Sequence, residues 1–454
     1  FGSVLWHPQA HKKVYLNPSA TSAVKQLDGI TTLGQIIDVQ TRQYNLSRER
    51  AACDTITLFE KLVAQRMITD DPQRGKAVQP DKVLPHLDYI TLALSNRCNL
   101  RCKHCFVSAG EPTADELQTE DWLCFFEQLP DFKLFDVILT GGEPLLYPHL
   151  WEIIGALNAM GIAVSIFTNG LLVDEAFVER AKGALINSLQ ISLDGVNAEM
   201  HERLRGQHGS FERAVRAIEL LSRNDIPVHV AVTVTQINYA AHPQFIEFCK
   251  ALGARSVNFS EIVFSGRAET FRDELALEAE QIAQMRLYHA CKRITERGIR
   301  IGEGLRPPDY AWDPFHKKPE EFQRPMCSAA KDCCDITATG DVLACQALWW
   351  DELKAGNILR IPLKEIWETS PIMTMFREMT VDQLRGCSEC EFKTDCGGGC
   401  RSLAYAAYKD VYAPSDEISC AWKKIFFRRF YNEVRTQPSL EALRSYERTL
   451  EPIG

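Results

Sequence analysis

Short apolar runs alternate with longer amphipathic stretches through the middle of the chain, between residues 87 and 300. The apolar runs predict strands over residues 90–94, 137–140, 164–167, 189–193, 228–234 and 257–261. Between them, apolar residues at helical spacing predict helices, for example over 211–221 and 243–252. Strands that alternate with helices predict an α/β fold with a parallel sheet. The sheet is either doubly wound or closed into part of a barrel, and periodicity leaves both open.

Residues 1–75 show a different pattern and are predicted to form a separate unit. Strands are predicted over 1–6 and 14–16, and helices over 21–27, 32–44 and 48–67. The last helix has an apolar face made of Ile56, Phe59, Leu62 and Val63. Two strands with three helices predict a winged-helix-like unit. A linker over residues 76–86 follows, within a stretch rich in Asp, Pro, Gly and Lys.

Composition and charge narrow the classes of partner. The 454 residues carry a net charge of −9, so we expect no grip on nucleic-acid phosphates and no nucleic-acid partner. No apolar run approaches the roughly 18 residues that cross a membrane, so no membrane partner is expected. The stretch that begins at Phe1 shows no signal-peptide pattern. Without such a pattern, sixteen cysteines predict metal ligation in a reducing, cytoplasmic setting rather than disulfides.

Three of these cysteines, Cys98, Cys102 and Cys105, share one short loop directly after the predicted strand 90–94. A cubane [4Fe–4S] cluster has four iron corners, so three protein thiolates leave one iron open for another ligand. A zinc knuckle is the alternative, although no fourth Cys or His follows at a zinc-like spacing. The loop therefore favours an iron–sulfur cluster with an open iron.

The spacing C-x₃-C-x₂-C resembles the signature of the radical S-adenosylmethionine (SAM) enzymes, in which SAM chelates the open iron. Gly141-Gly142-Glu143-Pro144 follows the next predicted strand and is similar to the GGEP motif of that family. The resemblance implies a partial (β/α)6 barrel over residues 87–305. It further implies a SAM pocket formed by Gly141, Gly142, Glu143, Pro144, Asn169, Ser192, Asp194, Arg205 and His104.

The resemblance also implies roles within this pocket. Glu143 would accept from the SAM ammonium group, while Ser192 and Asp194 would bond the ribose hydroxyls. Arg205 would pair with the SAM carboxylate, and His104 would stack beside the adenine. An ordinary polar strand end is the alternative for Ser192 and Asp194, and a surface salt bridge is the alternative for Arg205.

A second field of cysteines lies between residues 327 and 420 and resembles the SPASM extension of radical SAM enzymes. The resemblance assigns this extension to residues 306–430, with a helical tail over 431–454. It implies two auxiliary [4Fe–4S] clusters, for three clusters in all. Their ligands would be Cys327, Cys333, Cys345 and Cys400 for the first, and Cys387, Cys390, Cys396 and Cys420 for the second. Cys334 is an alternative to Cys333, and two Cys₄ zinc sites are an alternative to the clusters.

Four further cysteines stand singly in apolar, helical contexts: Cys53, Cys124, Cys249 and Cys291. We expect all four to be buried structural thiols.

The N-terminal unit has its own resemblance. The segment from Val14 to Pro18, leading to Leu27-Asp28-Gly29, is similar to the peptide-recognition domain of ribosomal-peptide maturases. Such a domain binds a leader peptide as an added strand. A structural cap or a DNA-binding winged helix is the alternative.

Together these resemblances imply an enzyme that cleaves SAM to a 5′-deoxyadenosyl radical and oxidatively crosslinks side chains of a ribosomal precursor peptide through C–C, C–S or C–O bonds. A flavodoxin- or ferredoxin-type donor would supply the electron. Asp332 and Asp335, which flank the proposed ligands, are candidates for a general base. The alternatives are a formylglycine-forming sulfatase maturase, an enzyme acting on a small molecule such as a tetrapyrrole, and a non-catalytic iron–sulfur carrier or DNA-binding redox regulator.

Overall fold

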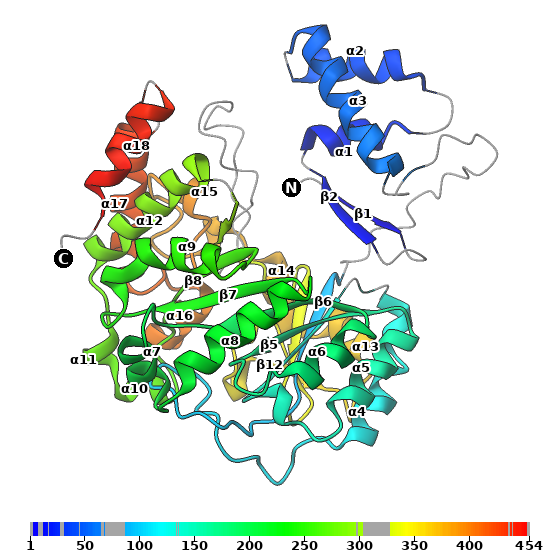
Figure 1. Ribbon diagram of the computed structural model, residues 1–454, viewed down its shortest axis with the longest axis vertical. Coiled ribbons are helices and arrows are strands. Elements are labelled where there is room, and N and C mark those ends of the chain that lie inside the picture. Colours follow the sequence, from blue (N-terminus) through cyan, green and yellow to red (C-terminus); the bar gives the residue numbers. More distant parts are fainter. Residues whose placement is uncertain are drawn as a thin grey trace. The chain divides into compact units, whose positions relative to one another are not determined.

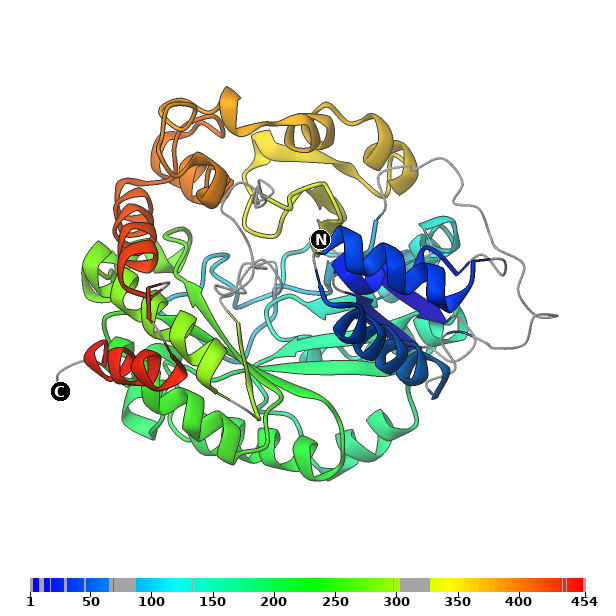
Figure 2. The ribbon, with the colours of Figure 1, turned by 90° about the horizontal axis from the view of Figure 1, so that it is seen from above.

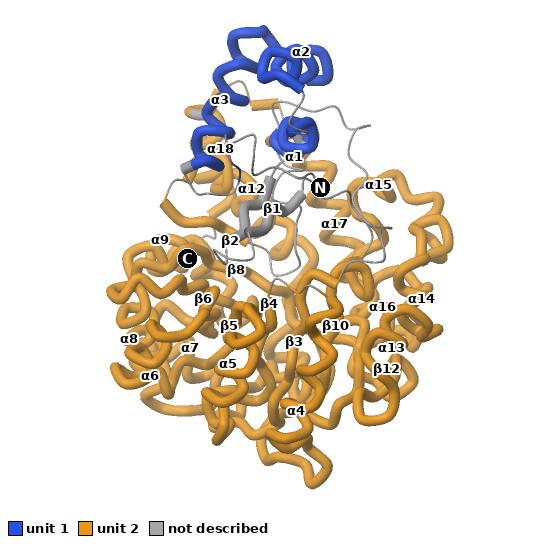
Figure 3. Tube along the Cα trace, turned by 90° about the vertical axis from the view of Figure 1, so that its right-hand side faces the viewer, with its two compact units in different colours: residues 1–84, 308–313 blue, residues 85–307, 314–454 orange. Residues whose placement is uncertain are grey.

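The computed structural model describes residues 3–7, 12–16, 18–27, 31–44, 46–64, 68, 87–132, 134, 136–296, 298–302, 327–434, 436–437 and 439–451. The chain divides into two compact units (Figure 3), one formed by residues 1–84 and 308–313 and the other by residues 85–307 and 314–454. The predicted boundary between barrel and C-terminal extension, at residue 305, lies outside the described residues.

The first unit consists of a two-stranded antiparallel sheet and three helices (Figure 1). Its elements are β1 (Ser3–His7), β2 (Lys12–Leu16), α1 (Pro18–Val24), α2 (Leu33–Gln43) and α3 (Arg48–Ala64). Helix α2 begins at a capping box in which Thr32 and Gln35 exchange hydrogen bonds. The predicted apolar face of α3 is partly wrong. Leu62 is buried against Leu58 and Phe59, but Ile56 and Val63 are each 39% exposed, because these two residues, seven positions apart, lie together along one flank of the stripe that packs inward.

The second unit is built on a ten-stranded sheet in the order β12-β11-β10-β3-β4-β5-β6-β7-β8-β9. Its parallel part comprises β3 (Tyr89–Ala93), β4 (Asp136–Thr140), β5 (Ala163–Thr168), β6 (Ile186–Ser192), β7 (Val228–Val234), β8 (Ser256–Glu261) and β9 (Arg300–Gly302). The six predicted strands and their parallel pairing are confirmed. The order of β3 to β9 along the sheet never reverses, which excludes the doubly wound alternative, since that fold requires a switch point.

Helices cover the outer side of this curved sheet (Figure 2). They include α4 (Thr119–Phe126), α5 (Leu150–Ala159), α6 (Glu175–Lys182), α8 (Ser210–Arg223), α9 (His242–Ala251) and α12 (Ala279–Thr295). Three further helices, α7 (Ala198–Arg205), α10 (Arg267–Thr270) and α11 (Arg272–Leu275), carry residues that contact the loop after β3. Strand β7 alternates buried and half-buried residues along its whole length. The fold is therefore an α/β partial barrel, in which the loops that follow the parallel strands gather at one rim, at the carboxyl ends of the strands.

The C-terminal part continues the same sheet. Strand β10 (Cys333–Ile336) pairs in parallel with β3, and the antiparallel strands β11 (Asp341–Leu343) and β12 (Lys354–Asn357) extend it. The helices that follow are α13 (Leu363–Thr369), α14 (Pro371–Glu378), α15 (Lys393–Cys396), α16 (Arg401–Tyr408), α17 (Glu417–Arg429) and α18 (Leu440–Thr449). Both α17 and α18 pack on α12. Among the described residues, no helix has the length and apolar character needed to cross a membrane.

Candidate functional site

The cysteine loop leaves the carboxyl end of β3 and folds back on itself. The amide of Cys98 donates to Gly110 O at 2.8 Å, and the amide of Gly110 donates to Asn96 O at 2.9 Å. Cys98, Cys102 and Cys105 pack into one apolar cluster with Leu100 and Leu171. Burial raises the pKa of Cys98 to about 11, and the neighbouring Cys102 and Cys105 thiols add to this. The loop thus gathers its three thiols in an environment from which water is largely excluded.

The two glycines after β4 let this loop pack closely. The amide of Gly142 donates to Ser95 O at 2.7 Å, and the amide of Glu143 donates to Arg97 O at 2.8 Å. A Cβ added at Gly142 would lie 2.3 Å from Arg97 O, and one at Gly141, whose φ is +136°, would lie 2.4 Å from Ser95 O. These glycines therefore meet the backbone of the cysteine loop itself, a contact that sequence reasoning did not foresee. Pro144 follows, buried, as the first residue of a short 3₁₀ turn.

Glu143 is 2% exposed and joins the ends of two strands. Its Oε1 accepts from Thr168 Oγ1 at 2.6 Å and from the Leu145 amide at 3.0 Å, while Oε2 accepts from the Asn169 amide at 2.8 Å. Burial raises the pKa of Glu143, although these hydrogen bonds oppose the shift. The side chain of Asn169 donates to Asn99 Oδ1 at 2.8 Å and so ties β5 to the cysteine loop. A carboxylate oxygen accepts two bonds, so Oε2 retains capacity for a ligand's N–H.

Asp194 and Arg205, which the sequence assigns to separate contacts with SAM, pair with each other. Asp194 is fully buried, and its Oδ2 lies 2.6 Å from Arg205 Nε and 3.3 Å from His104 Nε2. Burial alone would raise the pKa of Asp194, but the charge of Arg205 outweighs it and lowers the pKa. Arg205 is 8% exposed, so the alternative that it forms a salt bridge on the surface is wrong. Ser192 ends β6 half-buried.

This ion pair also reaches the cysteine loop. Arg205 Nη1 donates to Cys102 Sγ at 3.7 Å, and His104 lies within the loop itself. Burial lowers the pKa of His104 to about 4, so its imidazole is neutral beside Asp194. Asp194, Arg205 and His104, three of the side chains predicted to surround SAM, therefore form a network beside Cys102.

The carboxyl end of β8 braces the loop from another side, and sequence reasoning missed it. Arg267 donates from Nε to Cys102 O at 2.8 Å and from Nη2 to Ala109 O at 3.0 Å. Ser265 Oγ donates to Phe106 O at 3.0 Å and lies 3.3 Å from Trp349 Nε1 in the C-terminal part. In these hydrogen bonds the loop contributes only backbone carbonyl oxygens. The side-chain sequence of the loop therefore gives no signal from which the contact could be predicted.

The structure brings the first predicted auxiliary set together. The neighbouring Cys400 thiol adds to the rise that burial causes in the pKa of Cys327 and of Cys345, and Cys345 adds to the rise in the pKa of Cys333. Cys334 follows Cys333 on β10 and so faces the opposite side of the strand. It is fully buried, and besides burial only Asp335 raises its pKa. Cys333, not Cys334, stands with the other thiols.

The second predicted set converges in the same way. Burial raises the pKa of Cys387, and Cys420, Cys396 and Cys390 raise it further. Three glycines, Gly397 to Gly399, all have φ between +62° and +82°. They turn the chain sharply between Cys396 and Cys400, so these two cysteines join different sets.

A buried arginine stands between the two sets. Arg401 is 0% exposed and donates to Val411 O at 2.9 Å and to Ala413 O at 2.7 Å. Its positive charge lowers the pKa of both Cys327 and Cys387, although burial raises each pKa overall.

Three family models match the chain. That of the radical SAM superfamily covers residues 92–249, that of the SPASM iron–sulfur cluster-binding domain residues 327–391, and that of coenzyme PQQ synthesis protein D (PqqD) residues 2–68. The AdoMet-dependent heme synthase of Methanosarcina barkeri is 31% identical over 347 residues, which cover 74% of this chain and 96% of that one. This chain belongs to the radical SAM superfamily.

Further similarities place this radical SAM enzyme among SPASM-containing proteins. The mycofactocin maturase MftC of Mycobacterium tuberculosis is 30% identical over 331 residues, covering 72% of this chain and 82% of that one. The structure of Streptococcus suis SuiB bound to S-adenosylmethionine superposes with a TM-score of 0.62 at 17% identity, over 92% of this chain and 96% of that one. At this identity the structural likeness shows the fold alone.

The radical SAM and SPASM families imply [4Fe–4S] clusters and SAM, and the residues present fit them. All sixteen cysteines are free thiols, and eleven of them fall into the three groups described above. Among the described residues, no three His, Cys, Asp or Glu side chains meet at one point, as the ligands of a single ion do. A cubane takes one thiolate at each iron corner, so its ligands do not meet at a point.

The two aspartates predicted as candidates for a general base, Asp335 and Asp332, differ in burial. Asp335 is 8% exposed, and burial raises its pKa to about 7. It faces the same side of β10 as Cys333, beside the first auxiliary set, whereas Asp332 precedes the strand and is half-buried.

Two of the four single cysteines differ from the prediction. Cys249 and Cys291 are fully buried, as expected. Cys53 and Cys124 are exposed, because they lie on the outward faces of α3 and α4.

Proposed function

We propose that this radical SAM enzyme modifies a ribosomally made precursor peptide, joining side chains oxidatively through a C–C, C–S or C–O bond. The observation that carries the proposal is the N-terminal unit. Strands β1 and β2 pair over five residues, from Ser3 opposite Leu16 to His7 opposite Lys12, and form a two-stranded sheet. Such a sheet has an outer edge on each strand, where the backbone of an extended leader peptide can add as a third strand.

The relatives support a peptide substrate. The sporulation killing factor maturation protein SkfB of Bacillus subtilis is 30% identical over 285 residues, and MftC is likewise described as a maturase. SuiB, which shares the fold, has been solved bound to its precursor peptide SuiA. The match of the PqqD model to residues 2–68 points the same way.

We assign the cofactor sites by residue. Cys98, Cys102 and Cys105 would hold the cluster with the open iron, and the two four-thiol sets would hold two further [4Fe–4S] clusters. SAM bound at that open iron would supply the radical chemistry needed to remove a hydrogen atom from the substrate. The protein's part is to fix the loop and exclude water. Arg205, Arg267 and the glycines after β4 hold the loop, while Glu143 Oε2 offers an acceptor beside it.

A tetrapyrrole is the second candidate substrate, because the Methanosarcina barkeri relative is a heme synthase matched over 96% of its length. That match leaves about a quarter of the present chain unaccounted for. A small molecule would need no leader-binding unit, so capture of substrate by residues 1–75 separates the two candidates. The same capture also argues against a sulfatase maturase.

The test is anaerobic co-expression of the full chain with each small open reading frame beside its gene, followed by intact-mass measurement of the peptides. The proposal predicts a loss of two hydrogen atoms for each bond formed, absent with a Cys98→Ala variant. Peptides that keep their mass with the wild-type chain would contradict it.

A further inference from the structure

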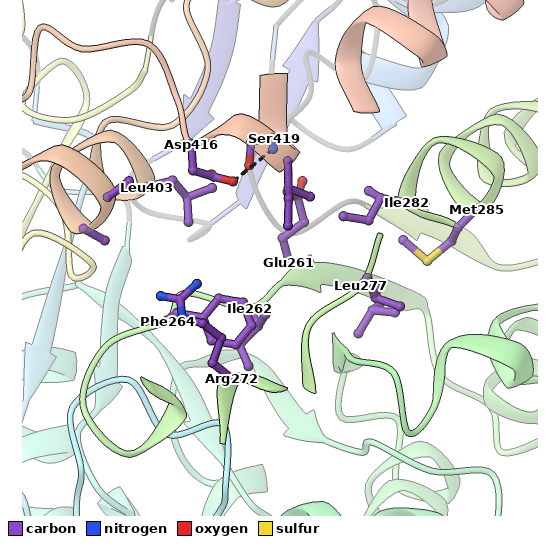
Figure 4. A pocket seen from close by; sticks show the side chains of 14 residues that line it. Glu261, Ile262, Phe264, Arg272, Leu277, Ile282, Met285, Leu403, Asp416 and Ser419 are labelled. Carbon is purple, nitrogen blue, oxygen red and sulfur yellow. Dashed lines mark hydrogen bonds between the residues drawn. The ribbon is translucent and has the colours of Figure 1, made fainter. Parts of the chain in front are cut away.

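A pocket opens beside the carboxyl ends of β7 and β8 (Figure 4). Its walls come from the ends of β7 and β8, from α11, from the first half of α12 and the segment before it, and from α16 and the start of α17. It holds about 670 Å³ of empty space, including the part open to solvent.

The lining is mainly apolar, and two of its charged groups are already satisfied. Glu261 accepts from Arg286 Nη2 at 3.2 Å through one oxygen and from Trp422 Nε1 at 3.1 Å through the other. Arg272 lies 4.2 Å above the Phe264 ring and donates twice to Glu269, at 2.7 and 3.0 Å. Both charged groups therefore already have partners within the protein and do not need a ligand to satisfy them.

Asp416 differs from them. It caps α17, and its Oδ1 accepts from the Ser419 amide at 3.0 Å, as the dashed line in Figure 4 shows. Its Oδ2 is buried and has no hydrogen-bond partner among the described residues. A buried acceptor without a donor costs free energy until a ligand supplies the donor.

Position links the pocket to both parts of the site. At its β7 end, the amide of Thr233, next to Val234, donates to Asp194 Oδ1 at 2.8 Å. Helix α11, which carries Arg272, also carries Glu274, whose carboxylate pairs with Lys103 of the cysteine loop at 2.8 Å. At the other end, Ser419 precedes Cys420 of the second auxiliary set.

We propose that this pocket binds an apolar side chain of the peptide substrate, while an N–H of the same peptide donates to Asp416 Oδ2. The inference rests on the proposed function and names a subsite for it. An apolar side chain matches the walls, and an amide or ammonium donor matches the unsatisfied Oδ2 of Asp416. A carboxylate-bearing ligand such as a tetrapyrrole would face Glu261 and Asp416, while the Arg272 cation is held by Glu269.

The first test uses N-acetyl-L-phenylalaninamide as the probe, with binding to the cluster-loaded full chain followed by ligand-observed NMR. Ala407→Phe fills the pocket from an exposed position on α16. Ala159→Phe adds the same ring at an exposed position on α5 and is the matched control. The proposal predicts that Ala407→Phe weakens probe binding about tenfold or more, the loss expected when one apolar side chain is kept from a pocket. Equal binding by both variants would overturn it.

Asp416→Asn tests the polar half. Asparagine also caps helices, so α17 is kept, but an amide N–H now competes with the donor of the ligand. The variant should weaken binding of the amide probe relative to N-acetyl-L-phenylalanine, whose carboxylate no longer meets a charge. An unchanged preference would overturn the role of Asp416.

The second test repeats the co-expression experiment with Ala407→Phe and Ala159→Phe. The pocket assignment predicts that only Ala407→Phe loses peptide modification. If both variants modify the peptide as the wild type does, the subsite is wrong while the proposed function stands. If the wild type itself modifies no peptide, the proposed function fails and the peptide assignment falls with it.

Discussion

Replacing Arg205 by methionine disturbs the buried network around Cys102 in a measurable way. The guanidinium pairs with Asp194 at 2.6 Å, at side-chain exposures of 10% and 0%. Without it, the side-chain oxygens of Asp194 are left with His104 at 3.3 Å and the Thr233 amide at 2.8 Å among the described residues. Removing one partner of a buried ion pair costs about 3–5 kcal/mol, because the other charge stays buried and uncompensated. We expect the free energy of unfolding to fall by about that amount.

An exposed ion pair of the same chemistry is the control. Arg216 pairs with Glu175 at 2.8 Å, but both side chains are about two-thirds exposed. Arg216→Met should change the free energy of unfolding by no more than about 1 kcal/mol. The double variant Asp194→Asn/Arg205→Met should be more stable than the sum of its single variants by about 0.5–3 kcal/mol, since no uncompensated charge remains.

The assay is anaerobic urea unfolding of the cluster-loaded chain, followed by tryptophan fluorescence and by the visible absorbance of the clusters. Coincident transitions of the two probes justify treating the unfolding as one step. If Arg205→Met and Arg216→Met unfold at the same urea concentration, the reasoning from burial is refuted.

Three further predictions rest on single residues. Gly142→Ala should lower the iron bound per chain, because its Cβ would overlap a carbonyl of the cysteine loop, whereas Gly155→Ala, with nothing within 4 Å, should not; equal iron contents would count against this packing. Cys333→Ala should reduce the iron content and Cys334→Ala should preserve it, and the reverse result would place the ligand on the other face of β10. Burial lowers the pKa of His242 to about 3, so below pH ~6.5 the unfolded chain binds a proton at this residue that the folded chain does not. As the pH falls, His242 should therefore cost up to about 1.4 kcal/mol of stability per pH unit in urea titrations, beside the contributions of other buried histidines such as His201 and His229. His242→Phe should reduce the slope by that amount, and an unchanged slope would show that the other groups cause it.

The strands of the barrel were predictable because short apolar runs bounded by turn residues are typical of buried strands. The choice between a barrel and a doubly wound sheet was not, since it depends on the order of strands in space. Strand β9 was missed because only three residues pair, Arg300 to Gly302. In the N-terminal unit the number and type of elements came from the pattern, but the exact face of α3 did not.

Among site residues, local motifs were predictable and long-range partners were not. Cysteine spacing pointed to groups of thiols that the structure brings together. The pairing of Asp194 with Arg205 joins the end of β6 to the end of α7, and spacing alone cannot reveal it. The choice between Cys333 and Cys334 depends on which face of β10 meets Cys345. The requirement for Gly142 comes from a backbone contact with residue 97, which leaves no trace in side-chain chemistry.

The most direct test of a peptide substrate is transfer of deuterium. Purified, cluster-loaded enzyme is incubated with SAM, a reductant and a precursor peptide deuterated at its side chains, and the 5′-deoxyadenosine is weighed. The account predicts deuterium in 5′-deoxyadenosine, lost when the leader is removed from the peptide. Unlabelled 5′-deoxyadenosine with every peptide, together with labelling from a deuterated tetrapyrrole, would contradict it.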